Sequence, residues 1–174
     1  MTLPVLPTDA DLALRTARLR LDPLTEADSE ELFGVLHDIR LHRFIGGEPP
    51  TLAQLRAWEA RVSPDGDQLW LNWTVRLAAT GEAVGYVQAT VTDGGAEIAY
   101  VVGTEFCGRG IATEAVEVMC AALRAMGVSR LRAHIHPEHV ISAAVARRAG
   151  LVATARFDDE GEELWSTGLE GNGE

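Results

Sequence analysis

The chain has 174 residues, of which 47% are hydrophobic and 24% charged, so we expect a single globular domain spanning residues 1–174. No run approaches the ~20 apolar residues that cross a bilayer, and the first residues do not form a signal peptide, which predicts a cytoplasmic protein with no membrane partner. The formal net charge of −11 disfavours nucleic acid as a partner and would attract cationic small molecules or basic peptide ends, although a negative surface also simply favours solubility.

The first half of the chain alternates between the strand period of two and the helix period of 3.6, which predicts a mixture of strands and helices. Thr25 and Thr51 are typical N-caps, and the turns around Gly81 and Gly94 have hairpin length, so the strands beside them are expected to be antiparallel neighbours. The elements expected here are a strand 16–24, helices 25–37 and 51–62, and strands 69–77, 83–92 and 96–102.

The second half begins with a glycine-containing turn and continues with a long amphipathic helix that Gly127 ends. The apolar stripe of this helix is expected to consist of Ile111, Ala115, Val118, Met119, Ala122 and Met126. The elements expected after it are a strand 130–136, a helix 139–149, and a hairpin of strands 151–157 and 163–167. The core of the predicted domain therefore spans residues 14–167, with 1–13 and 169–174 peripheral.

The turn at residues 107–115 carries the clearest ligand signal. Gly108 and Gly110 let the backbone approach an anion closely, and the helix that follows directs its free N–H groups and the positive end of its dipole to the same place. Arg109 adds a formal positive charge. The segment therefore predicts a phosphate-binding turn.

Three nucleotide ligands are compatible with a glycine turn of this kind, and the neighbouring residues separate them. A P-loop needs Lys and then Ser or Thr after Gly108, where this chain has Arg109 and Gly110. A dinucleotide site needs an acidic residue about 20 positions further on, where Arg130 stands. Neither pattern fits. The third ligand, the pyrophosphate of coenzyme A, needs loop amides and no metal.

Two runs around the turn, 97–103 and 106–115, resemble the acetyl-CoA-binding motif of the GNAT superfamily of N-acetyltransferases. In that motif, Gln or Arg is followed by two residues, Gly, one residue, and Gly or Ala. Cys107 stands at its first position. Segments 16–28 and 137–151 resemble the branch of the superfamily that acetylates the N-termini of ribosomal proteins, so the resemblance extends over nearly the whole chain.

The resemblance implies an α+β fold with a mixed central sheet of about seven strands, flanked by about four helices. The sheet of this family is splayed between two strands, here those ending at Val102 and His136, and the co-substrate acetyl-CoA lies in the opening. His139 stands where the branch has Asn. The residues expected to hold the coenzyme are Val101, Val102, Gly103, Cys107, Gly108, Arg109, Gly110, Ile111, Ala112, Thr113, His139 and Ser142.

Acetyl transfer to a primary amine by direct attack, in a complex of both substrates, makes three demands on the residues of the site. The ammonium must lose a proton, the oxyanion must meet a donor, and the leaving thiolate must meet an acid or a hydrogen bond. The resemblance implies Ser142 for the thiolate, and the amide of Val101 is our candidate for the oxyanion. Glu97 and His134 are the candidates for the catalytic base, through a carboxylate of raised proton affinity or an imidazole that titrates near neutrality.

The acceptor implied by the resemblance is a protein or peptide N-terminal α-amine. Two alternatives stay open: a small cationic amine such as a polyamine or aminoglycoside, and a catalytically silent, regulatory acyl-CoA-binding domain, because Ala146 stands where the family has a tyrosine acid. The residues considered for lining an acceptor cleft are Phe44, Gly46, Gly47, Trp70 and Asn72. Those considered for holding a cationic acceptor are Asp158, Asp159 and Glu160.

Two further patterns receive no functional assignment. His134, His136 and His139 have the spacing H-x-H-x-x-H, but no fourth ligand is evident and the reaction needs no metal. Cys107 and Cys120 are not spaced as a metal-binding pair, and both are expected to be reduced thiols. The chain is expected to act as a monomer or a homodimer.

Overall fold

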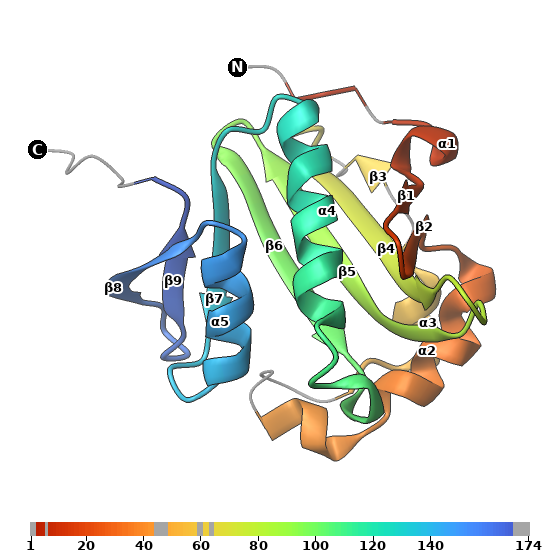
Figure 1. Ribbon diagram of the computed structural model, residues 1–174. Helices are drawn as coiled ribbons and strands as arrows, with labels where there is room; N and C mark the ends of the chain where they lie inside the picture. Colours follow the sequence, from red (N-terminus) through yellow and green to blue (C-terminus); the bar gives the residue numbers. More distant parts are fainter. Residues whose placement is uncertain (1–2, 6, 44–48, 59–60, 63–64, 169–174) are drawn as a thin grey trace, which may run out of the picture.

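The computed structural model describes residues 3–5, 7–43, 49–58, 61–62 and 65–168. These residues form one sheet with helices on both faces (Figure 1). The helices are α1 (Asp9–Leu12), α2 (Ser29–Leu36), α3 (Leu52–Arg56), α4 (Ile111–Ala125) and α5 (Val140–Arg148), with 3-10 helices η1 (Glu26–Asp28), η2 (Ile39–Arg43) and η3 (Thr104–Phe106). The strands are β1 (Leu14–Arg15), β2 (Leu19–Pro23), β3 (Arg61–Val62), β4 (Leu69–Leu77), β5 (Ala83–Thr92), β6 (Gly95–Val102), β7 (Leu131–Ile135), β8 (Val152–Phe157) and β9 (Glu163–Ser166).

The sheet is mixed, as predicted. Its strands lie in the order β1-β2-β4-β5-β6-β7-β9-β8, and β3 also pairs with β4. The pair β6–β7 is parallel and every other described pair is antiparallel. The sheet has nine strands instead of about seven, because β1 and β3, of two residues each, add short pairs that have no periodic pattern in the sequence.

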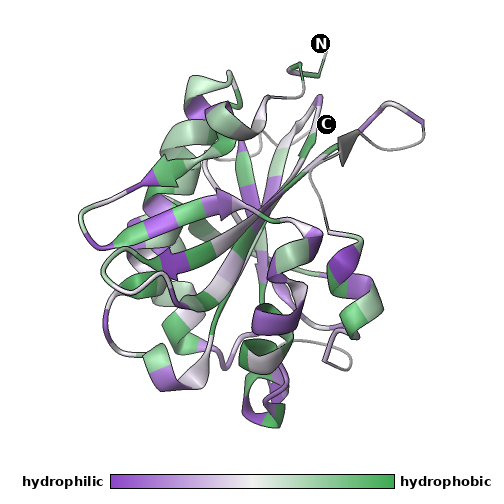
Figure 2. Cartoon of the chain, turned by 90° about the vertical axis from the view of Figure 1, so that its right-hand side faces the viewer, coloured by the Kyte–Doolittle hydropathy of each residue, from purple (hydrophilic) through white to green (hydrophobic). Residues whose placement is uncertain are grey.

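The two helical layers bury separate apolar clusters. Helices α4 and α5 contact β6 and β7 on one face, whereas α2 and α3 pack together, with α2 on β5 at the other face (Figure 1). The larger cluster lies under α4 and includes Ile98 and Met119, and the smaller one lies under α2 and includes Leu32, Tyr86 and Val101. Figure 2 shows hydrophobic segments, in green, recurring along the strands and their flanking helices. Successive residues of β6 therefore face opposite layers.

The helix that follows Thr51 is shorter than predicted. It ends at Arg56, and residues 61–62 form β3 instead of extending the helix. Its start agrees with the prediction, because the Thr51 hydroxyl accepts the N–H of Gln54 at 3.2 Å and the Gln54 side chain accepts the N–H of Thr51 at 2.8 Å. Residues 61–62 pair instead with the first residues of β4. This hairpin pairing overrides the local helical pattern.

The long helix α4 buries a wider face than the predicted stripe. Stripe positions that are only partly buried are Val118, Ala122 and Met126. Buried positions outside the predicted stripe are Val116, Cys120 and Leu123. The helix contacts β1, β2, β5 and α5 in addition to β6, so its inward face is set by neighbours from five elements. Among the helices described, none has the length and apolar character needed to cross a membrane.

Candidate active site

The turn between η3 and α4 has the backbone shape of an anion site. Gly108 and Gly110 adopt φ angles of 78° and 75°, in the left-handed region that favours glycine. Gly110 is the N-cap of α4, and its carbonyl accepts the N–H of Glu114 at 3.0 Å. The N–H groups of residues 111–113, in the first turn of α4, therefore lie at the positive end of a 15-residue helix.

Arg18, to which the sequence analysis assigns no role, braces this turn. Its Nη2 lies 2.6 Å from Oε2 of Glu114, and its Nη1 donates to the carbonyl of Arg109 at 2.9 Å. The Thr16 hydroxyl also donates to the Glu114 carboxylate. Partial burial raises the pKa of Glu114, but the hydrogen bonds from Thr16 and Arg18 outweigh it, so the net shift is downward. The ionised carboxylate is thus compensated by Arg18 and adds little net repulsion toward an anion.

The two remaining side chains of the turn have local partners. Cys107 is exposed, and its Sγ lies 3.6 Å from the carbonyl oxygen of Gly103, a weak hydrogen bond that ties the turn to the end of β6. The guanidinium of Arg109 lies 5.7 Å from the ring centroid of Phe106. This cation–π contact holds the charge of Arg109 over η3, beside the turn.

A cavity of about 400 Å³ lies at the start of α4. Its lining residues are Gly110, Thr113, Glu114, Glu117 and Arg148. Arg148 comes from the last turn of α5, far from the turn in sequence, and adds a cation beside the helix N-terminus. In the sequence, Arg148 belongs to the predicted helix 139–149 and has no assigned role. Helical periodicity does not reveal which neighbour the end of that helix approaches.

The opening predicted between β6 and β7 is present. The two strands pair only as far as Glu97 and Arg132, whereas β6 remains paired with β5 as far as Val102. Gly85 allows the close contact between β5 and β6, because a Cβ atom there would lie 2.1 Å from the carbonyl oxygen of Val101. The end of β6 is therefore held firmly on the β5 side and separates from β7 on the other.

Backbone alternation decides which amides of β6 face the opening. Ala96 donates its N–H to the residue before β7, and Gly103 donates its N–H to β5, each at 2.8 Å. Even-numbered residues therefore direct their backbone groups toward β7 and odd-numbered residues toward β5. The N–H groups of Tyr100 and Val102 face the opening. The N–H of Val101, the candidate oxyanion donor from sequence, points toward β5.

Tyr100 and Ser142 form a linked pair beside the opening. The phenol of Tyr100 donates to the carbonyl of Ser142 at 2.8 Å, and the Ser142 hydroxyl donates to the phenol oxygen at 3.1 Å. Burial raises the pKa of Tyr100 to about 12, and the hydrogen bond with Ser142 opposes that rise, so the phenol keeps its proton at neutral pH. Ala146, where the family has a tyrosine acid, is buried. The phenol of Tyr100 was not singled out from sequence.

Glu97 and His134 lie next to each other. Nδ1 of His134 is 3.2 Å from Oε1 of Glu97, and the side chains are 29% and 51% exposed, respectively. The two candidate bases thus form one pair at the point where β6 and β7 diverge. Glu97 is four residues from Val101, which is ~13 Å along a strand. The pair therefore lies well away from the end of β6.

His139, which the sequence predicts to hold the coenzyme, is the N-cap of α5 and is partly buried. Burial lowers its pKa, and the nearby His136 lowers it further, so the ring is neutral at pH 7. Within the described part of the chain, no group of three His, Cys, Asp or Glu side chains is arranged to hold a metal ion. His139 is thus placed at the start of α5 as a neutral ring.

The family model for the acetyltransferase (GNAT) domain matches residues 18–152. The chain belongs to the GNAT acetyltransferase family. It is accordingly an acetyl-CoA-dependent acetyltransferase, and the predictions of family, fold, enzyme class and co-substrate are confirmed. The match confirms the family, and membership of the ribosomal-protein branch stays a prediction. No curated protein matches the sequence.

Solved GNAT structures share the fold. The GNAT domain of S. lividans PAT has a TM-score of 0.74 at 19% identity, over 92% of this chain and 98% of that chain. A GNAT-family acetyltransferase from Bacillus anthracis has a TM-score of 0.72 at 18% identity, over 88% and 95%. Aminoglycoside acetyltransferase AAC(6')-Ib, solved with coenzyme A, has a TM-score of 0.68 at 19% identity, over 85% and 93%. Such identities support a common fold and say nothing of the acceptor.

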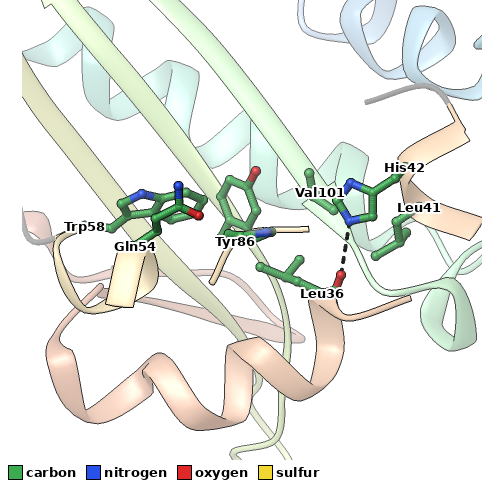
Figure 3. Close-up of a pocket in the computed structure, with 8 residues that line it drawn as sticks. Leu36, Leu41, His42, Gln54, Trp58, Tyr86 and Val101 are labelled. Carbon is green, nitrogen blue, oxygen red and sulfur yellow. Dashed lines mark hydrogen bonds between the residues drawn. The ribbon is translucent and has the colours of Figure 1, made fainter. Parts of the chain in front are cut away.

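This acetyltransferase has two neighbouring cavities on the α2–α3 face of the sheet, and Trp58 lines both. The larger, about 290 Å³, is lined by Leu36, Leu41, His42, Pro50, Gln54, Trp58, Tyr86 and Val101 (Figure 3). The smaller, about 240 Å³, is lined by Ala57, Trp58, Trp70, Asn72, Gln88, Ala89 and Thr90. Glu97 and Val101 are odd-numbered residues of β6, so their side chains face this same layer.

The predicted acceptor residues of the acetyltransferase divide into three groups. Trp70 and Asn72 line the smaller cavity, in agreement with their selection from sequence. Phe44, Gly46 and Gly47 lie outside the described residues. The acidic turn 158–160 is exposed between β8 and β9 and lines neither cavity.

Proposed function

We propose that this acetyltransferase modifies a protein or peptide N-terminal α-amine. The observation that carries the proposal is the pair of cavities that meet at Trp58. The smaller one presents the side-chain amides of Asn72 and Gln88, which can both donate and accept hydrogen bonds. These groups match the N–H and C=O groups of a peptide backbone, whereas a polyamine offers no acceptor. One cavity suits the first residue of a peptide and the other the peptide bond that follows it.

The described residues fit acetyl-CoA as the second substrate. The first-turn amides of α4 and the guanidinium of Arg148 supply positive partners for its phosphates, and two glycines remove side chains from the approach. The strand β6 offers the amides of Tyr100 and Val102 to the extended arm of the coenzyme, as an added strand would use them. His139 and Ser142 border the same opening from α5. We assign the phosphate end to the turn and the thioester end to the region of Val102 and Ser142.

The amine attacks the carbonyl carbon of the thioester directly, forming a C–N bond while the C–S bond breaks. An ammonium loses two protons on the way to an amide: one leaves to solvent before attack, and the other accompanies the departing thiolate. The backbone N–H of Val102, on the open edge of β6, donates a hydrogen bond to the oxyanion. The Ser142 hydroxyl turns from the phenol oxygen of Tyr100 and donates its hydrogen to the departing thiolate. Glu97 and His134, the base candidates from sequence, lie ~13 Å along β6 from Val101 and are too far away to take the first proton directly.

A small cationic amine is the second candidate acceptor, and one observation favours it. A cavity of about 250 Å³ between α2, the start of β5 and η3 includes four carboxylates, Glu31, Asp38, Glu82 and Glu105. Two of these are already engaged, Glu31 by Arg76 at 2.7 Å and Asp38 by Arg40 at 2.7 Å. A protein of the same fold is an aminoglycoside acetyltransferase solved with kanamycin. The peptide acceptor is favoured because the larger uncharged cavity, and not this one, is lined by Val101.

An acceptor panel separates these candidates. The full chain and acetyl-CoA are mixed with peptides bearing a free N-terminus, the same peptides with a blocked N-terminus, a polyamine or kanamycin. Products are identified by mass spectrometry, because the exposed Cys107 would itself react with a thiol reagent. We expect acetylation of the free peptides alone. Turnover confined to the polyamine or kanamycin would replace the acceptor class, and tight acetyl-CoA binding without turnover on any amine would indicate a silent domain.

A further inference from the structure

The larger cavity on the α2–α3 face is uncharged. None of its described lining residues is Asp, Glu, Lys or Arg, and most of its wall is aliphatic or aromatic. Its volume of about 290 Å³ is at the lower end of the ~300–1,000 Å³ typical of small-molecule sites, so it accommodates one side chain with its amine. A wall of this kind stabilises an apolar group and does not stabilise an ammonium ion.

Two aromatic rings form one side of this cavity. The rings of Trp58 and Tyr86 meet edge to face, with centroids 5.0 Å apart. Tyr86 is almost fully buried, and burial raises its pKa to about 12, so its hydroxyl is neutral at physiological pH. In Figure 3 the rings stand side by side across from Leu36 and His42. An apolar side chain placed between these rings and Leu36 would contact hydrophobic surface on both sides.

His42 supplies the cavity with an unused lone pair. Its Nε2 lies 3.2 Å from the carbonyl oxygen of Leu36, and since a carbonyl only accepts, Nε2 carries the hydrogen. In the neutral ring, Nδ1 is then an acceptor. This atom is buried and has no hydrogen-bond partner among the described residues. Figure 3 shows the imidazole directed toward the Val101 side of the cavity.

We propose that this cavity holds the first residue of the acceptor, that this residue has an apolar or aromatic side chain, and that Nδ1 of His42 takes the proton from its α-ammonium. The inference rests on the proposed function and names its substrate class. Because Nδ1 is buried, contact with the amine requires η2 to shift slightly. η2 has five residues and no fully buried side chain, so little packing opposes such a shift.

The proton transfer balances without any further reactant. Nδ1 of His42 receives one proton from the R–NH₃⁺ group and becomes an imidazolium, while Nε2 keeps its hydrogen bond to Leu36. The neutral R–NH₂ attacks the thioester carbonyl, and its second proton leaves with the coenzyme thiol. The imidazolium returns its proton to solvent, which restores the neutral ring.

Position distinguishes His42 from the other titratable groups. It lines the same cavity as Val101, whereas the Glu97–His134 pair is ~13 Å further along β6. The charged neighbours on its own segment are Asp38, Arg40 and Arg43, and Asp38 is paired with Arg40. The titratable side chain facing it from β5 is Tyr86. His42 is therefore the base candidate nearest the proposed site of attack.

The substrate class is tested on the unmodified chain with peptides that differ only in the first residue. We expect kcat/KM for peptides beginning with Phe or Leu to exceed that for peptides beginning with Asp or Lys by ~10–200-fold, the range expected of an apolar pocket. Replacing Trp58 with Ala should reduce that ratio. Turnover that ignores the first residue would overturn the substrate class and leave the peptide acceptor standing, whereas turnover on no peptide would overturn both.

The base is tested with His42→Gln, because a glutamine amide can replace the Nε2–H donor to Leu36 and has no counterpart of Nδ1. We expect kcat/KM to fall ~10²–10⁴-fold and the acidic limb of its pH profile to disappear, with acetyl-CoA affinity unchanged as the check on folding. His37→Gln, at an exposed position on the end of α2, is the matched control and should leave both unchanged. Glu97→Gln should keep the acidic limb. Near-normal activity of His42→Gln, or an unchanged limb, would overturn the assignment.

Discussion

The two halves of the site are built in different ways. The coenzyme half consists mostly of backbone groups, namely a turn with two left-handed glycines, the first turn of α4 and the open edge of β6. The acceptor half consists mostly of side chains from α2, η2, α3, β4, β5 and β6 around two uncharged cavities. Backbone geometry depends on a few local residues, so the coenzyme half can be predicted from a short motif. The acceptor half can change side chain by side chain without disturbing the fold.

The largest expected effect comes from breaking the coenzyme half at Gly110. A Val at φ 75° is strained, and its Cβ would lie 3.4 Å from Nη2 of Arg18, the residue that braces the turn. We expect acetyl-CoA affinity, measured by calorimetry, to fall at least ~10–100-fold, because ~1–3 kcal/mol of strain at the turn is relieved only by moving the amides.

Gly127 provides the matched control for this change. It has φ 90°, follows the other end of α4 and has open space around its Cβ position. Gly127→Val should therefore cost similar stability by thermal melting but leave acetyl-CoA affinity near normal. Equal losses of affinity in the two variants would mean that Gly110 acts through the stability of the helix and not through the turn.

A smaller effect is expected from the chain's two tyrosines, which lie one in each half. Tyr100→Phe removes the hydroxyl that Ser142 contacts, so we expect kcat to fall ~10–100-fold while the KM values stay close to normal. Tyr86→Phe, in the acceptor cavity, should change the KM for the peptide and leave acetyl-CoA binding unaffected. The rates are measured with both substrates varied.

The pair also predicts non-additivity. Tyr100 acts on the thiolate through the Ser142 hydroxyl that it orients, so Tyr100→Phe combined with Ser142→Ala should be little slower than the worse single variant. Multiplied losses would show two independent roles. If Tyr86→Phe lowered kcat as much as Tyr100→Phe, the division of labour between the halves would be wrong.

The same contrast explains what sequence alone could reveal. The glycine turn was predicted because it depends on contiguous residues with a fixed backbone requirement, and the family resemblance carried by that motif implied the splayed strands and the fold. Glu97 and His134 were each selected, but their pairing depends on the register of two strands far apart in the chain. Tyr100, Arg18 and His42 were missed for the same reason. Their roles arise only where α5, α4 and η2 bring distant segments together, and periodicity shows which face is apolar without showing what it meets.

The smallest expected effect concerns Glu114, whose contact with Arg18 links the first strands to the coenzyme turn. Its pKa is lowered from the ordinary value of 4.5, so the stability it contributes is fully present above that pH and is lost as the pH falls through the lower pKa of the folded state. Arg18 is about half exposed, which limits the contribution to ~1 kcal/mol, or ~2–4 °C in Tm. Glu114→Gln should therefore melt below the wild type at pH 7, and the difference should shrink as the pH is lowered below 4.5. Glu117→Gln, an exposed change one turn further along α4, serves as the control. A difference in Tm that is constant with pH would show that the Glu114 side chain stabilises the turn by its shape alone. The charge of Glu114 would then contribute nothing to the stability of the coenzyme half.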